Sequence, residues 1–191
     1  GMYDKEYADI CDCYGYLLSL GKSTNSYKAA DYLETALNIR RALYASDPEK
    51  YRHDYAWTED NLGKVLTHTS FDQAQNLLES ALELRREDGN ISEIAWTLHN
   101  LADLYSANPD YCSQAEKCYQ ESLTLREELE QMNPSSHLAD ISWIQFKLAQ
   151  LYLKHDYADK SKLSEAERLL HQAYHTQRAL EEKTPGMFVT D

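Results

Sequence analysis

The sequence predicts an all-α protein, an α-α superhelix of four helix–turn–helix repeats with eight helices in all. Three observations support this prediction. One pattern of small and large residues occurs four times in the same order along the 191 residues. Only 6 glycines and 4 prolines interrupt the chain, and long runs of β-branched residues are missing. Turn and helix-capping residues separate the copies. Because stacked repeats offer extended surfaces, we expect a binding function.

Each repeat combines two short motifs, one for each of its helices. Residues three and four apart share one helical face, so a small residue lets the neighbouring helix approach while a large one fills the groove beside it. The first helices carry Tyr14-Gly15-x-x-Leu18, Leu62-Gly63-x-x-Leu66, Leu101-Ala102-x-x-Tyr105 and Leu148-Ala149-x-x-Tyr152. The second helices carry Ala29-x-x-x-Leu33-x-x-Ala36, Ala74-x-x-x-Leu78-x-x-Ala81, Ala115-x-x-x-Tyr119-x-x-Ser122 and Ala166-x-x-x-Leu170-x-x-Ala173.

The first half of the chain contains two repeats, residues 3–46 and 47–88. In the first repeat we expect helices over 3–20 and 27–44, separated by Gly21 and a polar turn. In the second, Asp47 caps a helix that opens with Pro48 and reaches about residue 67. Ser70 caps the helix that follows, and Asp88-Gly89-Asn90 ends it.

The second half contains the repeats 91–131 and 136–182. Ser92 is the candidate cap of the third repeat's first helix, and Asn108-Pro109 separates its two helices. Asn133-Pro134 opens the fourth repeat. Ser164, with Glu167 three residues on, forms a possible capping box for the last helix, although that helix could begin a few residues earlier.

A short tail, residues 184–191, follows the last helix. A terminal repeat normally needs a polar cap over its open face, and no solvating helix follows the last repeat. Three explanations stay open: the tail folds back, the array forms a homodimer, or the chain was cut from a longer protein. We expect the four repeats, residues 3–183, to form a single array.

Composition excludes several classes of function. A net charge of −13 without a basic cluster argues against nucleic acid, which requires grouped Lys and Arg. No apolar run approaches the ~18 residues of a membrane span, and the first ten residues do not resemble a secretion signal. The four cysteines lack Cys-x-x-Cys spacing and are expected to be reduced thiols of a cytoplasmic protein: Cys11, Cys13, Cys112 and Cys118.

The repeated motifs resemble the tetratricopeptide repeat, whose pattern is Leu-Gly-x-x-Tyr, then Ala-x-x-x-Phe, then a helix-breaking Pro. The alanines that open the second motifs stand at 29, 74, 115 and 166, farther apart than the usual 34 residues. Long second helices ending in Leu-x-Ile/Leu-Arg, at Arg40, Arg85 and Arg126, are similar to the longer kinesin-light-chain type. The resemblance implies a right-handed superhelix whose first helices line a concave groove.

The resemblance also implies which positions of each first helix face a ligand in that groove. The first copy supplies Asp9, Asp12, Cys13, Tyr16 and Ser19, and the second supplies Trp57, Asp60, Asn61, Lys64 and Thr67. The third supplies Trp96, His99, Asn100, Asp103 and Ser106, and the fourth supplies Trp143, Phe146, Lys147, Gln150 and Leu153.

All three tryptophans, Trp57, Trp96 and Trp143, occupy one repeat position. They form either an aromatic ladder for a ligand or wedges against the preceding repeat. Asn61 and Asn100 share another position, where an amide pairs either with a ligand backbone or between neighbouring helices.

Charge in the expected groove is segregated. Asp9, Asp12 and Asp60 come from the first copies and Lys147 from the last, so a ligand is expected to place basic residues against the former and acidic residues near the latter. The dicarboxylate clamp of chaperone-binding members of the family is not expected, because Asp60 stands where the clamp requires a lysine.

No pattern indicates catalysis. His171 and His175 have metal-ligand spacing on a helix but no third ligand nearby in sequence, so a solvated face is the preferred interpretation and no metal or cofactor is expected. The sequence therefore predicts a non-enzymatic scaffold for a protein or peptide ligand. Two alternatives are an oligomerisation or regulatory module, which an exposed apolar strip on the last helix would favour, and a sensor of a signalling peptide.

Overall fold

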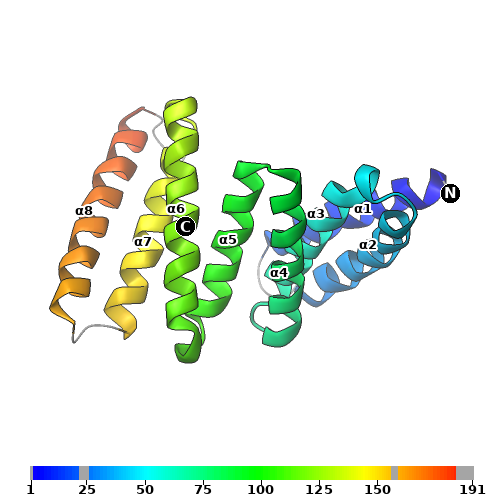
Figure 1. Ribbon diagram of the computed structural model, residues 1–191, viewed down its shortest axis with the longest axis horizontal. Coiled ribbons are helices and arrows are strands. Elements are labelled where there is room, and N and C mark those ends of the chain that lie inside the picture. The colour runs from blue at the N-terminus through cyan, green and yellow to red at the C-terminus, as the bar shows by residue number, and fades with distance from the viewer. Residues whose placement is uncertain (1, 22–25, 156–158, 184–191) are drawn as a thin grey trace. The chain divides into compact units, whose positions relative to one another are not determined.

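A computed structural model describes residues 2–21, 26–155 and 159–183. The described residues form eight α-helices and one 3₁₀ helix, with no strand among them (Figure 1). The tail 184–191 and most of the polar turn after Gly21 lie outside the described residues. The helices are α1 (Met2–Ser19), α2 (Ser26–Ser46), α3 (Pro48–Leu66), α4 (Phe71–Asp88), α5 (Ile91–Ser106), η2 (Pro109–Tyr111), α6 (Cys112–Met132), α7 (Leu138–His155) and α8 (Lys160–Lys183).

Most helices that follow one another in the sequence pack together, as the repeat pattern predicts. The chain divides into two compact units, Gly1–Leu104 and Tyr105–Asp191. In the first unit α1 packs on α2, α2 on α3, and α3 on α4. In the second, α6 packs on α7 and α7 on α8. The predicted all-α class with paired helices is therefore confirmed.

The small residues of the motif allow this close pairing. Ala74, Leu78 and Ala81 of α4 are fully buried. A Cβ atom placed on Gly63 of α3 would stand 2.7 Å from Cγ of Leu78 and 3.3 Å from the carbonyl oxygen of Ala74. Real Cβ atoms essentially never approach a carbon so closely, so α3 and α4 touch at a point where only hydrogen fits.

Helix ends follow local chemistry, with two corrections to the sequence prediction. Asp47 caps α3 as predicted, accepting a hydrogen bond from the backbone nitrogen of Lys50 at 3.3 Å, with Pro48 in the first turn. Gly89 ends α4 with φ at 71°, the left-handed conformation that favours glycine. The predicted cap Ser92 is wrong, because Asn90 accepts from the backbone nitrogen of Glu93 and α5 begins at Ile91.

The second correction concerns α8, which begins at Lys160 rather than beside Ser164. The carboxylate of Asp159 accepts a hydrogen bond from the backbone nitrogen of Ser161 at 2.8 Å and so supplies the cap. Ser164 lies inside the helix. The earlier start left open by the sequence is the one that the structure adopts.

Candidate functional site

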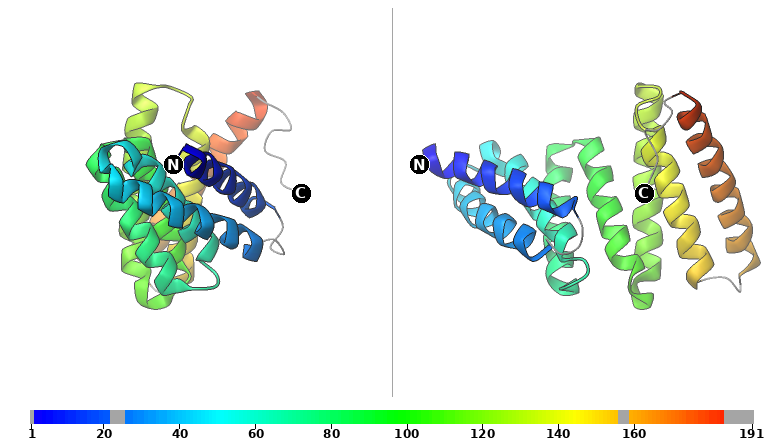
Figure 2. Two further views of the ribbon diagram at one scale, coloured as in Figure 1. Left: turned by 90° about the vertical axis from the view of Figure 1, so that its right-hand side faces the viewer. Right: turned by 180° about the vertical axis from the view of Figure 1, so that it is seen from behind.

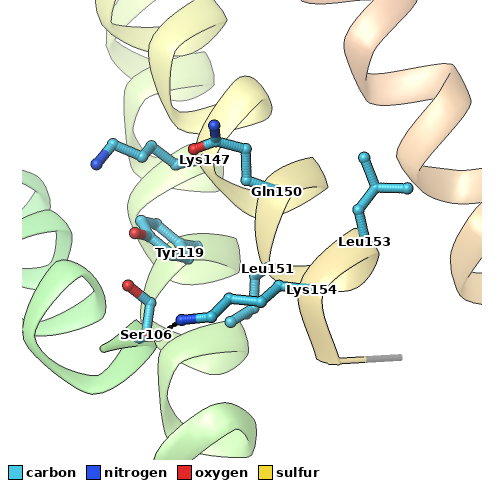
Figure 3. Close-up of a pocket in the computed structure, with 7 residues that line it drawn as sticks. All are labelled: Ser106, Tyr119, Lys147, Gln150, Leu151, Leu153 and Lys154. Carbon is cyan, nitrogen blue, oxygen red and sulfur yellow. Dashed lines mark hydrogen bonds between the residues drawn. The ribbon is translucent and has the colours of Figure 1, made fainter. Parts of the chain in front are cut away.

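The second unit contains a hollow of about 480 Å³ beside α7 (Figure 3). α7 supplies most of its wall, while α5 contributes its last residue and α6 one aromatic ring. Its lining residues are Ser106, Tyr119, Lys147, Gln150, Leu151, Leu153 and Lys154.

Helical periodicity places the α7 residues of this hollow together. Three, four and seven residues after Lys147 come Gln150, Leu151 and Lys154. These spacings place all four residues on one face of the helix. Figure 3 shows the side chains of Lys147, Gln150 and Lys154 extending to the same side of α7. The opposite face carries the buried residues Ala149 and Tyr152, which anchor the helix.

The hollow carries positive charge. Two of its seven lining residues are lysines and none is acidic. The ammonium group of Lys154 lies 3.5 Å from the backbone carbonyl oxygen of Ser106. The ammonium group of Lys147 lies 5.4 Å from the centre of the Trp143 ring, a cation–π contact that directs the lysine along the helix surface. In a chain of net charge −13 this is a local exception.

The first unit has a second hollow, of about 340 Å³ and opposite charge, between α1 and α3. Its residues are Asp9, Asp12, Cys13, Tyr16, Arg40, His53, Asp54 and Trp57. Three carboxylates surround the single guanidinium group, so the hollow is acidic when His53 is neutral.

Arg40 organises those carboxylates. Nη2 of Arg40 lies 2.9 Å from Asp12 and 3.0 Å from Asp9, and Nη1 lies 3.5 Å from Asp54. The hydroxyl of Thr58 donates to Asp12 at 3.0 Å. Burial raises the pKa of Asp12 to about 6, although Arg40 and Thr58 act in the opposite direction.

The same arrangement recurs at each arginine that ends a second-helix motif. Arg40, Arg85 and Arg126 are all nearly buried. Each forms an ion pair with the first helix of the next repeat, through Asp54, Glu93 and Asp140 respectively. The motif noted in the sequence as a family feature is thus an ion-pair connection between successive repeats. Its partners escaped the sequence analysis because they lie 8 to 14 positions away, on another helix.

The predicted groove residues fall into three groups by exposure. Trp57, Trp143 and Gln150 are exposed, whereas Lys64, Trp96, His99, Asp103 and Lys147 are half-buried. Asp60, Asn61 and Asn100 are buried, as is Asp12.

The buried members interact mainly with the protein itself. The amide of Asn100 donates to the carboxylate of Asp60 at 2.9 Å, which corresponds to the alternative in which the asparagine bonds between neighbouring helices. Arg85 lies 3.4 Å from the same carboxylate. Asn61 has a buried amide nitrogen without a hydrogen-bond partner among the described residues.

Each tryptophan ring contacts a cation. The guanidinium of Arg85 lies 5.9 Å from the Trp57 ring centre, and the ammonium of Lys64 lies 5.3 Å from that of Trp96. Trp57 and Trp143 are 38% and 49% exposed. Both of these rings therefore combine packing on one side with an open surface on the other.

Three lining residues of the hollow beside α7 were not among the predicted groove residues: Tyr119, Leu151 and Lys154. Tyr119 was assigned to the core from its motif position; it is 1% exposed yet borders the hollow. Lys154 lies seven residues after Lys147, and this spacing of two helical turns was the available signal.

The described residues offer no obvious metal centre. Within them, no group of three or more His, Cys, Asp or Glu side chains is placed to hold an ion. His171 and His175 approach to 3.1 Å between their Nε2 atoms on the exposed side of α8. None of the four cysteines, all of which lie in the described ranges, forms a disulfide. No helix in those ranges is both long and apolar enough to cross a membrane.

Comparisons with known proteins agree with this architecture. Residues 54–128 match a family model described as tetratricopeptide repeat, which confirms the resemblance over α3 to α6. The chain is similar to the crystal structure of BtubC (BKLC) from P. vanneervenii, with a TM-score of 0.74 and 20% identity over 96% of this chain and 68% of that chain. A weaker similarity, to the DHF58 filament, has a TM-score of 0.47 and 14% identity over 95% of this chain and 97% of that chain. No curated protein matches the sequence.

Proposed function

We propose that this chain is a non-enzymatic scaffold that binds an acidic segment of a protein partner in the hollow beside α7. Tetratricopeptide repeats generally mediate protein–protein interactions. The four reduced cysteines fit a cytoplasmic protein. The proposal therefore concerns which surface binds and what chemistry it selects.

The composition of the hollow is the observation that carries the proposal. Ser106 comes from the third copy, and Lys147, Gln150 and Leu153 come from the fourth; all four stand at positions where the family resemblance implies ligand contact. Two lysines and no acid line this hollow. Electrostatic complementarity therefore favours a partner that brings carboxylates.

The spacing of the lysines specifies the ligand further. Lys147 and Lys154 are seven residues apart, so their helix positions are separated by about 10 Å along the axis. An extended peptide advances about 3.3 Å per residue, so two carboxylates three residues apart match this separation. Leu151, which lies between the two lysines, borders the hollow and gives its floor an apolar surface for an intervening leucine. The proposed motif is Glu-x-x-Glu in an extended segment.

The first unit's hollow supports the complementary half of the interaction. Asp9 and Asp54 are partly exposed there, with side chains 43% and 32% accessible. A lysine or arginine of a partner would meet their carboxylates. The proposal therefore follows the charge pattern expected from the sequence, in which basic residues of a ligand lie against the first repeats and acidic residues lie near the last repeat.

Fluorescence anisotropy with labelled peptides tests the proposal. The probe is an eight-residue peptide with two glutamates three positions apart and a leucine between them; the controls carry adjacent glutamates or lysines. We expect the spaced glutamate peptide to bind best, and binding to weaken as salt rises. Lys147→Glu and Lys154→Glu should each weaken it roughly tenfold or more, since a charge-assisted contact is replaced by repulsion.

Lys117→Glu is the matched control, because Lys117 is an exposed lysine of α6 outside the hollow. The same change in net charge should leave the affinity within about twofold. If Lys117→Glu weakens binding as much as Lys147→Glu does, only the overall charge matters and the proposed hollow is wrong. Equal binding of all three peptides would also contradict the proposal.

A further inference from the structure

The outward face of α1 is an apolar strip. Tyr7, Ile10, Tyr14 and Leu17 are 54%, 65%, 49% and 62% exposed, respectively. The opposite face of the same helix carries the buried Ala8 and Cys11, which pack against α2. α1 is therefore apolar on two sides, whereas a helix at a protein surface normally presents a polar outer face.

The last helix does not share this property. The sequence analysis looked for an uncovered strip on α8, yet its exposed positions are mainly polar: Glu167, Arg168, His171, Gln172, His175 and Arg178. Tyr174 is the one large hydrophobic residue of α8 that is strongly exposed, at 60%. Within the described residues, the exposed apolar strip therefore lies on α1 and not on α8.

The four residues of the strip have the spacing of a helix-packing seam. They follow one another by three, four and three positions, the a and d pattern of a coiled coil. Beside them, the Tyr32 ring of α2 meets the Tyr14 ring edge-on, with centres 4.8 Å apart. Figure 2 shows α1 and α2 side by side in both views. A shallow hollow of about 350 Å³ lies along this edge.

The exposed area is sufficient for a dimer. The strip and Tyr32, which is 38% exposed, leave roughly 500 Å² of side chain accessible, if a full side chain presents about 200 Å². Two such faces would bury about 1,000 Å² before any flanking polar atoms are counted, which reaches the lower bound for a specific interface. A patch of this size on a monomer is itself often functional.

The charge around the strip permits a second copy to approach. From Gly1 to Ser46 the sequence has five Lys and Arg against six Asp and Glu, a net charge of −1, whereas the whole chain carries −13. Two copies would repel one another through most of their surface. The first repeat is nearly neutral, and Lys28 and Asp31 at the edge of the strip offer both signs of charge.

We propose that the strip on α1 binds the same strip of a second copy, with the two α1 helices antiparallel about a two-fold axis. The midpoint of the seam lies between Ile10 and Tyr14, so Tyr7 would face Leu17 of the second copy and Ile10 would face its Tyr14. Every layer then pairs one aromatic ring with one branched aliphatic side chain. This dimer does not depend on the α7 hollow, so either assignment can fail without the other.

Sedimentation velocity over a range of concentrations tests the dimer on the intact chain. We expect a species of twice the 22.1 kDa chain mass that grows with concentration. Ile10→Glu and Leu17→Glu should each abolish it, since each places a carboxylate in the seam of both copies. Their helical circular dichroism should be unchanged, because both positions are exposed. Tyr174→Glu, on the exposed side of α8, should dimerise like the wild type.

A second measurement tests the antiparallel order. In a Cys13→Ser background, a Tyr7→Cys chain mixed with a Leu17→Cys chain should form disulfide-linked heterodimers faster than either variant links to itself. Faster homodimer formation would overturn the antiparallel arrangement. A wild-type chain that is monomeric at all concentrations, or a dimer that persists in both glutamate variants, would overturn the use of this face.

Discussion

Arg85 offers the sharpest test of how the repeats are held together. Its side chain is 1% exposed and extends from α4 to two other helices. On α3 it faces the carboxylate of Asp60 at 3.4 Å. On α5 it donates to the backbone carbonyl of Glu93 at 3.1 Å and to the hydroxyl of Thr97. Arg85→Met keeps a long apolar stem in the same space but removes the charge and the donors.

The structure indicates how large the effect should be. Burial raises the pKa of Asp60, while Arg85 opposes that rise. In the Arg85→Met variant the buried Asp60 carboxylate keeps its hydrogen bond from Asn100. It loses the cation that lies 3.4 Å away in the wild type. Breaking one partner of a buried ion pair costs about 3–5 kcal/mol, a large part of the 5–15 kcal/mol that stabilises a typical domain. The double variant Asp60→Asn with Arg85→Met removes both charges and should recover most of that loss.

Urea unfolding followed by far-ultraviolet circular dichroism at pH 7 measures these free energies. Arg86→Met is the control at the adjacent, exposed position and should cost about 1 kcal/mol or less. The Arg85→Met protein should gain stability as the pH falls, because Asp60 can then take up a proton. The reasoning is refuted if Arg85→Met costs no more than the control, or if the double variant is no more stable than Arg85→Met alone.

Two further predictions concern the first unit. Because the folded-state pKa of Asp12 is about 6, against 3.8 for the free side chain, the folded chain binds a proton between these values that the unfolded chain does not. This group should therefore raise the free energy of unfolding by up to about 3 kcal/mol as the pH falls from 7 to 4, and Asp12→Asn should flatten that slope in urea titrations; an unchanged slope would contradict the assignment. Gly63→Ala gains about 1 kcal/mol of helix propensity but forces Leu78 away from a 2.7 Å contact, at a cost of about 1–3 kcal/mol. We expect a net loss near 1 kcal/mol by the same method, and a more stable variant would show that the two helices separate freely.

The helices and their pairing could be predicted because their signals are local. The spacing of Ala74, Leu78 and Ala81 already defines the face that α4 buries. The residue that caps a helix N-terminus was harder to predict, because two side chains that can accept the capping hydrogen bond lie within about one turn of the same helix start. Asn90 was chosen over Ser92 in this way, and the sequence offered no means of ranking them.

Side-chain pairing between helices could not be predicted in the same manner. Asp9 and Asp12 lie less than one turn apart and were both assigned to the groove. In the structure Asp12 is buried beneath Arg40 while Asp9 stays partly exposed. Which of them turns inward depends on where α2 places Arg40, and that position is fixed only when the helices pack. The same limit applies to Asp60, whose partners come from α4 and α5.

The position two residues before the motif's first large residue differs in charge between the copies. The first two copies have Asp12 and Asp60 there, and each is paired with the arginine of its own second helix. The fourth copy has Phe146, which packs against Trp143 with ring centres 5.7 Å apart. An aromatic ring at this position brings no carboxylate, so the neighbouring Lys147 can give the α7 hollow its positive charge. This position therefore holds a buried, arginine-paired carboxylate in the first two copies and an aromatic ring in the fourth, where the charge of the neighbouring lysine is not opposed by an acid on the same helix position.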